Sequence, residues 1–206
     1  GSVRRWSLYP AIKRVFDVAA TVAVAPLALP LVGVCAFMIS RDGNTAFYSQ
    51  PRLGKNGKQF RIWKLRSMVP DADEVLQSYL EQNPDAKAEW EAHQKLTNDP
   101  RITRMGRFLR KYSIDEFPQL FNVLIGDMSL VGPRPMCPDQ RSQYPGTAYF
   151  QLRPGMTGLW QISERNQTTF AERAIYDNRY AGALSLATDL RILLITPLVV
   201  LRGTGL

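Results

Sequence analysis

Residues 18–40 carry no charged side chain, and this stretch constrains the fold more than any other part of the chain. Its twenty-three residues exceed the roughly 20 that an apolar helix needs to cross a bilayer. Pro26 and Pro30 fall inside it, and each proline removes a helical hydrogen bond and clashes with the preceding turn. The sequence therefore predicts an apolar helix that is interrupted at its prolines.

Basic residues flank this segment on both sides: Lys13 and Arg14 precede it, and Arg41 and Arg52 follow. Because basic flanks prefer the cytoplasmic side, both ends favour the same face of a membrane, which a single crossing cannot satisfy. We expect a helix that breaks at the prolines and returns to the face it entered. A spanning helix with a proline kink is the alternative, and uniform apolarity disfavours a helix buried in a soluble core.

Composition narrows the chemistry. The 206 residues carry a net charge of +8, which calls for an anionic partner such as nucleic acid, anionic lipid or a phosphorylated substrate. Cys35 and Cys137 are too few for a disulfide framework and are expected to be reduced. His93 is the only histidine, which argues against Ser–His or Cys–His catalysis and against a histidine-rich zinc site.

The chemically richest segment is residues 99–135. Arginines at every third position, 101, 104, 107 and 110, predict one cationic stripe on a helix. Two adjacent carboxylates, Asp115 and Glu116, follow, then an apolar run closed by Gly126 and a Gly-Pro-Arg-Pro sequence that contains Arg134. This order brings cations and carboxylates together within one short segment.

Two interpretations of residues 113–116 remain open. Ser113 and Glu116 have the spacing of a helix-capping box, in which case the carboxylates only complement the helix dipole. Alternatively, a carboxylate here attacks a phosphoryl group or holds Mg²⁺, while Arg110 and Arg134 hold phosphate oxygens. The second interpretation indicates phosphoryl transfer.

Residues 45–50 and 59–65 are rich in β-formers, and Asn56-Gly57 between them predicts a hairpin turn. Lys64 and Arg66, at the end of the second strand, either reach a substrate phosphate or are solvated residues of an edge strand. Residues 71–91 hold seven of the 18 acidic residues and only one base. They predict two exposed helices, broken at Asn83-Pro84, that form a cover or a partner surface rather than a metal cluster.

The C-terminal third offers fewer signals. Residues 153–160 form a turn-rich segment whose two glycines suit nucleotide or phosphate binding, or a plain structural turn. Tyr176 and Asp177 fall on an expected helix. Residues 190–201 are apolar but too short to span a membrane, so they belong to the core or, as we favour, to the membrane interface.

These motifs resemble a known family. The sequence from Ser113 to Leu120, the sequence from Gly126 to Pro135 and the Arg153-Pro154-Gly155 loop are similar to those of the bacterial sugar transferases, the monotopic polyprenyl-phosphate phosphoglycosyl transferases. The resemblance covers nearly the whole chain. Within the family, the chain is most similar to the enzymes that start exopolysaccharide repeat units by moving galactose- or glucose-phosphate.

The resemblance implies an α+β monotopic membrane protein. Residues 1–42 would form the N-terminal segment and a proline-broken re-entrant helix, anchored through Lys13, Arg14, Asp17 and Pro26. Residues 43–206 would form a mainly helical cytosolic transferase domain with a small β-hairpin and interfacial helices. The expected location is the bacterial inner membrane, in contact with its lipids, with the catalytic domain facing the cytoplasm. A homo-oligomer is left open.

The resemblance also implies the chemistry. Asp115 would be the nucleophile and the Mg²⁺ ligand, and Glu116 would assist the second step or the metal. The donor would be a UDP-sugar and the acceptor polyprenyl phosphate, with no nucleic acid; the sequence does not select the sugar. Tyr176 and Asp177 would lie near the site, and the phosphate-binding residues would be Arg110, Arg134, Arg165, Lys64, Arg66 and Arg153. Glu164 stands where the family has glycine, which weakens the match at Arg165.

An alternative function from another class is a membrane-anchored basic module that binds anionic lipid or nucleic acid. The net charge and the arginine stripe support it. It gives no reason for the paired carboxylates or for the Gly-Pro-Arg-Pro sequence.

Overall fold

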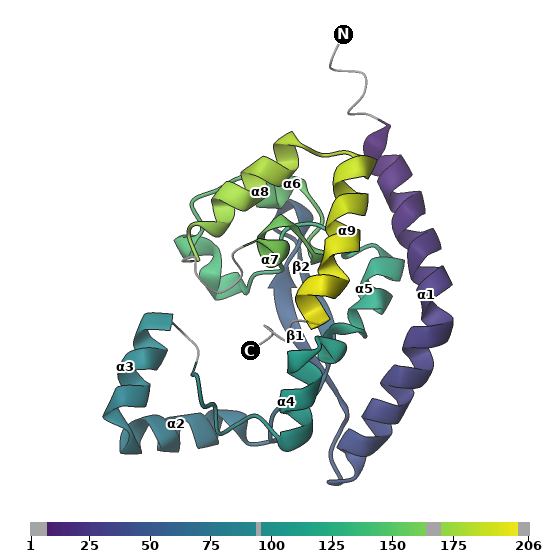
Figure 1. Ribbon diagram of the computed structural model, residues 1–206. Helices are drawn as coiled ribbons and strands as arrows, with labels where there is room; N and C mark the ends of the chain where they lie inside the picture. Colours follow the sequence, from purple (N-terminus) through teal and green to yellow (C-terminus); the bar gives the residue numbers. More distant parts are fainter. Residues whose placement is uncertain (1–7, 94–95, 164–169, 202–206) are drawn as a thin grey trace.

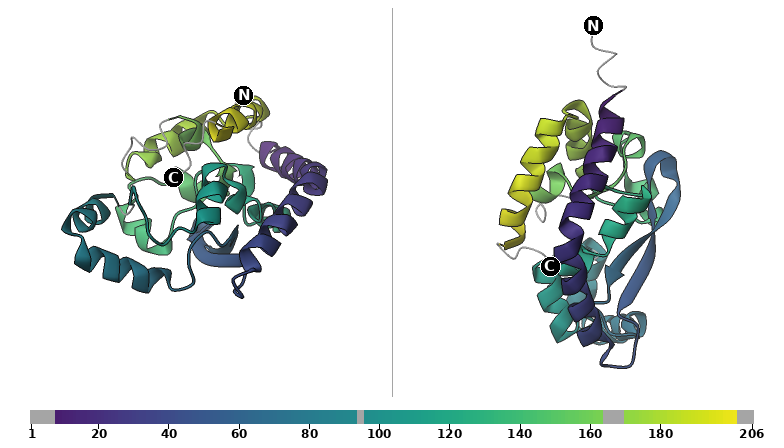
Figure 2. Two further views of the ribbon diagram at one scale, coloured as in Figure 1. Left: turned by 60° about the horizontal axis from the view of Figure 1, so that its bottom comes forward. Right: turned by 90° about the vertical axis from the view of Figure 1, so that its right-hand side faces the viewer.

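The computed structural model describes residues 8–93, 96–163 and 170–201. Its first element, α1 (Tyr9–Ser40), has 32 residues; of the described helices, it alone is long and apolar enough to cross a membrane. The helix is continuous through Pro26 and Pro30 and bends along its course (Figure 1; Figure 2, left). A proline can bend a helix without ending it. The structure therefore does not confirm the predicted interruption.

One face of α1 is buried at intervals between Asp17 and Ile39, and Figure 1 shows the helix running along one side of the folded body. The buried positions are four or seven residues apart, the spacing that keeps side chains on one helical face. The opposite face exposes large apolar side chains, among them Leu27 and Phe37, which are 79% and 73% exposed. The buried positions are Asp17, Thr21, Ala28, Cys35 and Ile39.

Both ends of α1 are fastened to the same folded body. Near its start, Lys13 forms an ion pair with Asp189, and Arg14 donates to the carbonyl oxygens of Val123 and Leu124. At its end, the Arg66 guanidinium donates to the Ile39 carbonyl oxygen and pairs with Asp42. The helix therefore starts and ends against one body.

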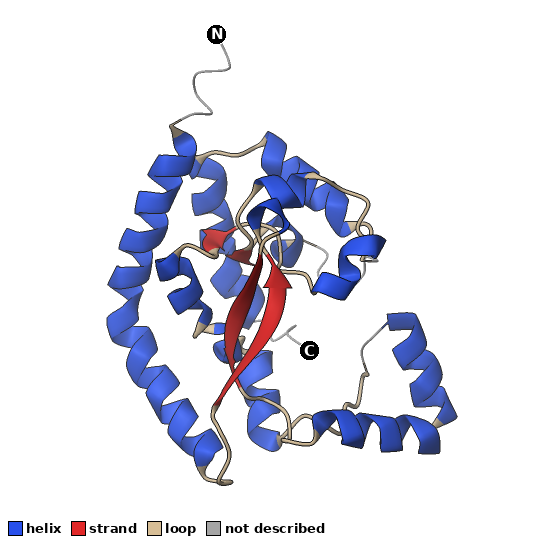
Figure 3. Ribbon diagram, turned by 180° about the vertical axis from the view of Figure 1, so that it is seen from behind, coloured by secondary structure: helices blue, strands red, loops and turns tan. Residues whose placement is uncertain are grey.

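The expected hairpin is confirmed. Strands β1 (Phe47–Leu53) and β2 (Gln59–Leu65) pair antiparallel around the 3₁₀ turn η1 (Lys55–Gly57), in which Asn56 has a φ of 59°. The first strand starts two residues later and extends three residues further than predicted. Figure 3 shows the twisted hairpin on the face opposite the viewer of Figure 1. The inner side of β2 packs through Phe60 and Ile62 into a core cluster.

The two acidic helices are also confirmed. α2 (Ala72–Gln82) and α3 (Pro84–His93) are separated at Asn83. Figure 1 shows them projecting from the body as an angled arm, and neither α2 nor the described side chains of α3 are fully buried. Only the beginning of α2 reaches the main cavity described below, through Ala72 and Asp73.

The remaining elements form a mixed helical and β body. They include a short parallel pair, β3 (Ser129–Val131) with β4 (Gly155–Thr157). Gly155 allows the close approach, because a Cβ there would lie 2.0 Å from the Gly132 nitrogen. The elements are α4 (Arg104–Lys111), η2 (Ile114–Glu116), α5 (Gln119–Ile125), β3 (Ser129–Val131), η3 (Pro138–Gln143), α6 (Ala148–Gln151), β4 (Gly155–Thr157), α7 (Leu159–Ile162), α8 (Arg173–Gly182) and α9 (Leu186–Leu201).

The C-terminal helix α9 contributes to both the core and the surface. Asp189 and Ile192 are buried, whereas Leu194 and Leu198 are 75% and 59% exposed. The helix lies beside the first half of α1 (Figure 1; Figure 2, right). Helices α1, α9 and α5 each expose large apolar side chains, Phe121 among those of α5.

Candidate active site

The carboxylate pair lies on a tight turn between two helices. Thr103 caps α4 by accepting a hydrogen bond from the Gly106 nitrogen. Ser113, after the end of α4, has a φ of 53° and makes no capping hydrogen bond, so the predicted capping box is wrong. Asp115 and Glu116 belong to the 3₁₀ turn η2 that leads to α5.

A cavity of about 500 Å³ opens beside this turn. Its walls come from the hairpin, the segment after β2, the start of α2 and the end of α4. Six of the residues that the sequence proposed for the site line it together: Asp115, Glu116, Lys64, Arg66, Arg110 and Arg134. Tertiary structure therefore joins side chains from three separate parts of the sequence.

Asp115 is the most enclosed of these carboxylates, with 7% of its surface exposed. Burial raises the pKa of its carboxyl above the ordinary value, while the ammonium of Lys64 is the strongest of the influences that lower that pKa. The Lys64 nitrogen lies 4.0 Å from Asp115 Oδ2. Arg110 and Arg134 also stabilise the ionised form. The Asp115 carboxylate is thus largely shielded from solvent and lies near three cationic side chains.

Glu116 has a different role in the cluster. Its Oε1 accepts from Lys64 at 2.8 Å and from Arg134 at 3.3 Å. The glutamate therefore ties a residue of β2 to a residue of the loop after β3. It fixes two of the cations that face Asp115.

Arg110 is held by the segment that follows β2. Its Nε donates to Ser67 Oγ at 2.8 Å, and burial lowers the pKa of its guanidinium. Gly106, one turn earlier in α4, permits this packing because a Cβ there would lie 1.9 Å from the Ser67 carbonyl oxygen. Arg110 is the arginine of α4 that lines the cavity.

The predicted arginine stripe is confirmed for three of its four residues, since Arg104, Arg107 and Arg110 lie on α4. Arg101 precedes α4 and pairs with Asp99 at 2.7 Å, so it is not on the helix at all. Arg104 and Arg107 are on the helix and exposed. The regular spacing thus distributes the arginines over different environments.

Two other residues predicted to bind phosphate have partners within the protein. Arg66 lines the cavity, but its guanidinium donates to the Thr45 carbonyl oxygen and to Asp42. Arg153 donates to the Gly126 carbonyl oxygen at 2.9 Å and lines neither of the two cavities described here. Arg165 lies outside the described residues.

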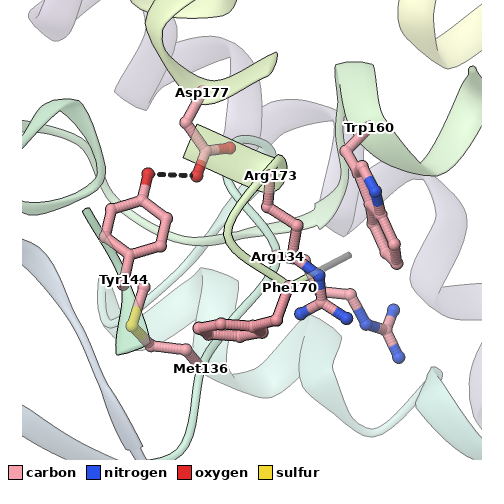
Figure 4. Close-up of a pocket in the computed structure, with 7 residues that line it drawn as sticks. All are labelled: Arg134, Met136, Tyr144, Trp160, Phe170, Arg173 and Asp177. Carbon is pink, nitrogen blue, oxygen red and sulfur yellow. Dashed lines mark hydrogen bonds between the residues drawn. The ribbon is translucent and has the colours of Figure 1, made fainter. Parts of the chain in front are cut away.

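A second, smaller cavity adjoins the first through Arg134, which lines both. Figure 4 shows Arg134 and Arg173 in this cavity with the rings of Trp160 and Phe170. Asp177, placed near the site by the sequence, lines this cavity, whereas Tyr176 lines neither. The complete lining is Arg134, Met136, Tyr144, Trp160, Phe170, Arg173 and Asp177.

Asp177 is buried in the wall of the smaller cavity. It accepts a hydrogen bond of 2.6 Å from the Tyr144 hydroxyl. Burial raises the pKa of its carboxyl to about 6, against the lowering effects of that hydrogen bond and of Arg173. Near neutral pH, the ionised form of Asp177 therefore lowers the free energy of unfolding.

The sequence did not point to Arg173; it named Arg52 as a basic flank of the apolar segment without a site role, and Trp160 only as the end of the turn-rich segment 153–160. All three line one of the cavities. The signal for Arg173 was weak, because an arginine at the start of a helix is common on protein surfaces. Tertiary structure places the Arg173 guanidinium carbon 4.2 Å from the centroid of the Trp160 ring.

A metal ion would rely on few protein ligands. Within the described ranges there is no cluster of three or more His, Cys, Asp or Glu residues of the kind that cages a metal. Mg²⁺ in phosphate chemistry takes one or two carboxylates and completes its shell with water and substrate phosphates. The Asp115–Glu116 pair matches that donor set.

Comparison with known proteins identifies the family. The model of the bacterial sugar transferase family matches residues 8–203. A UDP-galactose-lipid carrier transferase of Erwinia amylovora is 46% identical over 94% of this chain and 41% of its own length. An undecaprenyl-phosphate galactose phosphotransferase of Salmonella typhimurium is 47% identical with the same two coverages.

A shorter relative is the exopolysaccharide production protein ExoY of Rhizobium meliloti, which is 47% identical over 87% of this chain and 81% of its own length. The chain thus spans about two fifths of the Erwinia and Salmonella relatives and most of ExoY. The matched region contains both cavities and every element from α1 to α9. The chain therefore belongs to the bacterial sugar transferase family.

Proposed function

We propose that the chain transfers a sugar-1-phosphate from a UDP-sugar to polyprenyl phosphate, giving polyprenyl-diphosphate-sugar and UMP. The observation that carries this proposal is the dry Asp115 carboxylate in a 500 Å³ cavity, facing Lys64, Arg110 and Arg134. The names of the relatives point to galactose or glucose as the sugar and to exopolysaccharide synthesis as the setting. A module that only binds anions is not favoured, because it has no use for a buried carboxylate among its cations.

In the first step, an Asp115 oxygen attacks the β-phosphorus of the UDP-sugar. The bond from that phosphorus to the bridging oxygen breaks, and UMP leaves with the electron pair. A sugar phosphate is then bonded to Asp115 as an acyl phosphate. Lys64, Arg110 and Arg134 neutralise the charge that develops on the phosphoryl and bridging oxygens.

In the second step, a phosphate oxygen of polyprenyl phosphate attacks the same phosphorus. The bond between phosphorus and the Asp115 oxygen breaks, and the free carboxylate returns. Glu116 holds Lys64 and Arg134 in place through both steps. In the second step we assign it the further role of assisting the incoming phosphate.

Mg²⁺ fits this site as the cofactor. Asp115 would be its protein ligand. Glu116 suits the metal less well, because Lys64 and Arg134 already occupy that carboxylate and would compete with Mg²⁺ for it. When bound, the metal would neutralise diphosphate charge and orient the donor. The chain itself positions the nucleophile and supplies the remaining positive charge.

We propose that the protein lies at the cytoplasmic face of the inner membrane, with α1 entering and leaving by that face. Both ends of α1 are fastened to one body, and the outward faces of α1 and α9 are apolar. Acceptor lipid and cytosolic donor could then meet at the interface. Cysteine labelling of Ser7 and Asn44 replacements, in a chain without its native cysteines, tests this in intact cells: labels on opposite faces would contradict it.

The function itself is tested by intact-protein mass after mixing with Mg²⁺ and UDP-galactose or UDP-glucose, without acceptor. We expect a hexose-phosphate adduct of roughly 240 Da, as covalent catalysis requires, and no adduct with Asp115→Asn. The donor that gives the adduct also identifies the sugar. If no UDP-sugar gives an adduct, and polyprenyl phosphate causes no UMP release, the proposal is wrong.

A further inference from the structure

Three arginines from distant parts of the sequence gather where the two cavities meet. Arg52 belongs to β1, Arg134 to the loop after β3, and Arg173 begins α8. Arg52 lines the larger cavity, Arg173 the smaller one, and Arg134 both. We call these three residues, Arg52, Arg134 and Arg173, the arginine cluster at the junction of the two cavities.

The positive charges of this arginine cluster repel one another. Burial lowers the pKa of the Arg52 guanidinium, and the charge of Arg134 lowers it further. Burial likewise lowers the pKa of Arg173 to about 10, with Arg134 and Arg52 adding to the effect. Like charges in a partly dry site repel one another strongly unless an anion lies between them.

Protein carboxylates in the described part of the chain offset the charge of these arginines only in part, Asp177 acting on Arg173 and Asp139 on Arg52. Neither Arg52 nor Arg173 has a carboxylate within ion-pair distance there. Arg52 donates to Gln50 Oε1 at 2.7 Å and contacts Cys137 Sγ. Glu116, the acid that Arg134 contacts, is shared with Lys64. The cations therefore outnumber the acids at this position.

The Arg173 guanidinium is fixed in position by aromatic rings and keeps a hydrogen-bond donor that no described residue uses. Its guanidinium lies 4.2 Å from the Trp160 ring centroid and 4.9 Å from that of Phe170, contacts that fix a cation without neutralising it. Its Nε is buried and has no hydrogen-bond partner among the residues that the structure describes. A buried donor without a partner costs free energy that a bound acceptor would recover. Figure 4 shows this arginine with both rings in the wall of the smaller cavity.

We propose that Arg52, Arg134 and Arg173 form a subsite for a phosphate monoester beside Asp115, with Arg134 shared between this subsite and the surroundings of that carboxylate. The proposal rests on the proposed function, whose product UMP and acceptor polyprenyl phosphate are both phosphate monoesters. Arginine forks suit such a group because they donate in pairs to its oxygens. The subsite would hold that phosphate next to the reacting centre.

Equilibrium binding in detergent tests the subsite, with UMP and farnesyl phosphate, a short polyprenyl phosphate, as separate ligands. The parent is Asp115→Asn, which binds without turnover. Arg173→Gln should lower the affinity for one of the two ligands by about tenfold or more, which is the loss typical of a charge-assisted hydrogen bond. The ligand that is weakened identifies the source of the phosphate. Arg179→Gln is the matched control, because Arg179 is exposed on the same helix and lines neither cavity.

Three further measurements complete the test. Arg173→Lys keeps the charge and should bind with intermediate affinity, and uridine, which lacks phosphate, should bind equally to parent and Arg173→Gln. If Arg173→Gln does not fold, Arg52→Gln takes its place with the same expectation. Unchanged affinity for both ligands in the variant, or no binding of either ligand to the parent, would overturn the subsite. The proposed function fails separately, by the absence of UMP release from the wild-type chain.

Discussion

The Lys64 ammonium nitrogen lies 2.8 Å from Glu116 Oε1, which joins strand β2 to the turn η2. The same nitrogen is 4.0 Å from Asp115 Oδ2. One lysine therefore contacts one carboxylate directly and stabilises the ionised form of the other. This arrangement leads to the first prediction.

Lys64→Met should slow UMP release by about tenfold or more, because a charge-assisted interaction of the reacting group is lost. Burial raises the pKa of Asp115 and Lys64 opposes that rise, so the pKa should rise further in the variant. The nucleophile then stays protonated to higher pH, and the acidic limb of the rate–pH profile should move upward. Lys58→Met, at the exposed hairpin turn, is the control; an unmoved limb in Lys64→Met would contradict the prediction.

Asp177→Asn should change how stability depends on pH. The folded-state pKa of about 6 exceeds the ordinary 3.8, so the folded protein binds the proton more tightly, and wild-type stability falls as pH rises between these values. Asparagine removes this cost. From pH 4 to pH 7, the variant should gain about 1–3 kcal/mol relative to wild type.

Urea unfolding in detergent at several pH values would measure this difference. Asp85→Asn, which removes an exposed carboxylate of α3, should leave the pH dependence unchanged. A difference between Asp177→Asn and wild type that does not vary with pH would mean that Asp177 is not titrating as described.

Asp189→Ala should destabilise the protein by about 3–5 kcal/mol, the usual result of removing one partner of a buried charged pair. Asp189 is fully buried and accepts from Lys13, Tyr9 and Tyr180. Without it, an ammonium and two hydroxyls lose their partner, and the start of α1 loses its link to α9. Thermal unfolding and limited proteolysis of α1 would measure both effects, with Glu81→Ala on the exposed arm as control. An unfolding curve equal to that of wild type would contradict the assigned role.

Gly106→Ala should destabilise the protein by about 1–3 kcal/mol or more, as overpacking does, and should also reduce activity. The new Cβ would meet the Ser67 carbonyl oxygen, and Ser67 is the residue that holds Arg110. Gly182→Ala is the matched control, because nothing lies within 4 Å of its Cβ position. Parallel measurements of unfolding and UMP release should separate the two variants, and equal behaviour would show that the close approach is unimportant.

The sequence predicted the local elements well wherever a local signal existed. Asn56-Gly57 marked the hairpin turn, and Asn83-Pro84 marked the end of one acidic helix and the start of the next. The capping box failed because its spacing describes a helix start, and Ser113 instead takes a left-handed conformation after α4. Likewise, Pro26 and Pro30 predicted an interruption, but a long helix that is buried at intervals along one face can bend and continue.

What the sequence determined by itself was the chemical inventory: an apolar N-terminal helix, a carboxylate pair after arginines, and an excess of positive charge. Tertiary structure decided which of those residues act together. It brought Lys64 to Glu116 and gathered Arg52, Arg134 and Arg173 at one junction. It also turned Arg66 and Arg153 toward backbone oxygens. Residue spacing encodes only neighbours within a helix or strand, whereas these contacts join positions far apart in the chain and depend on how the elements pack.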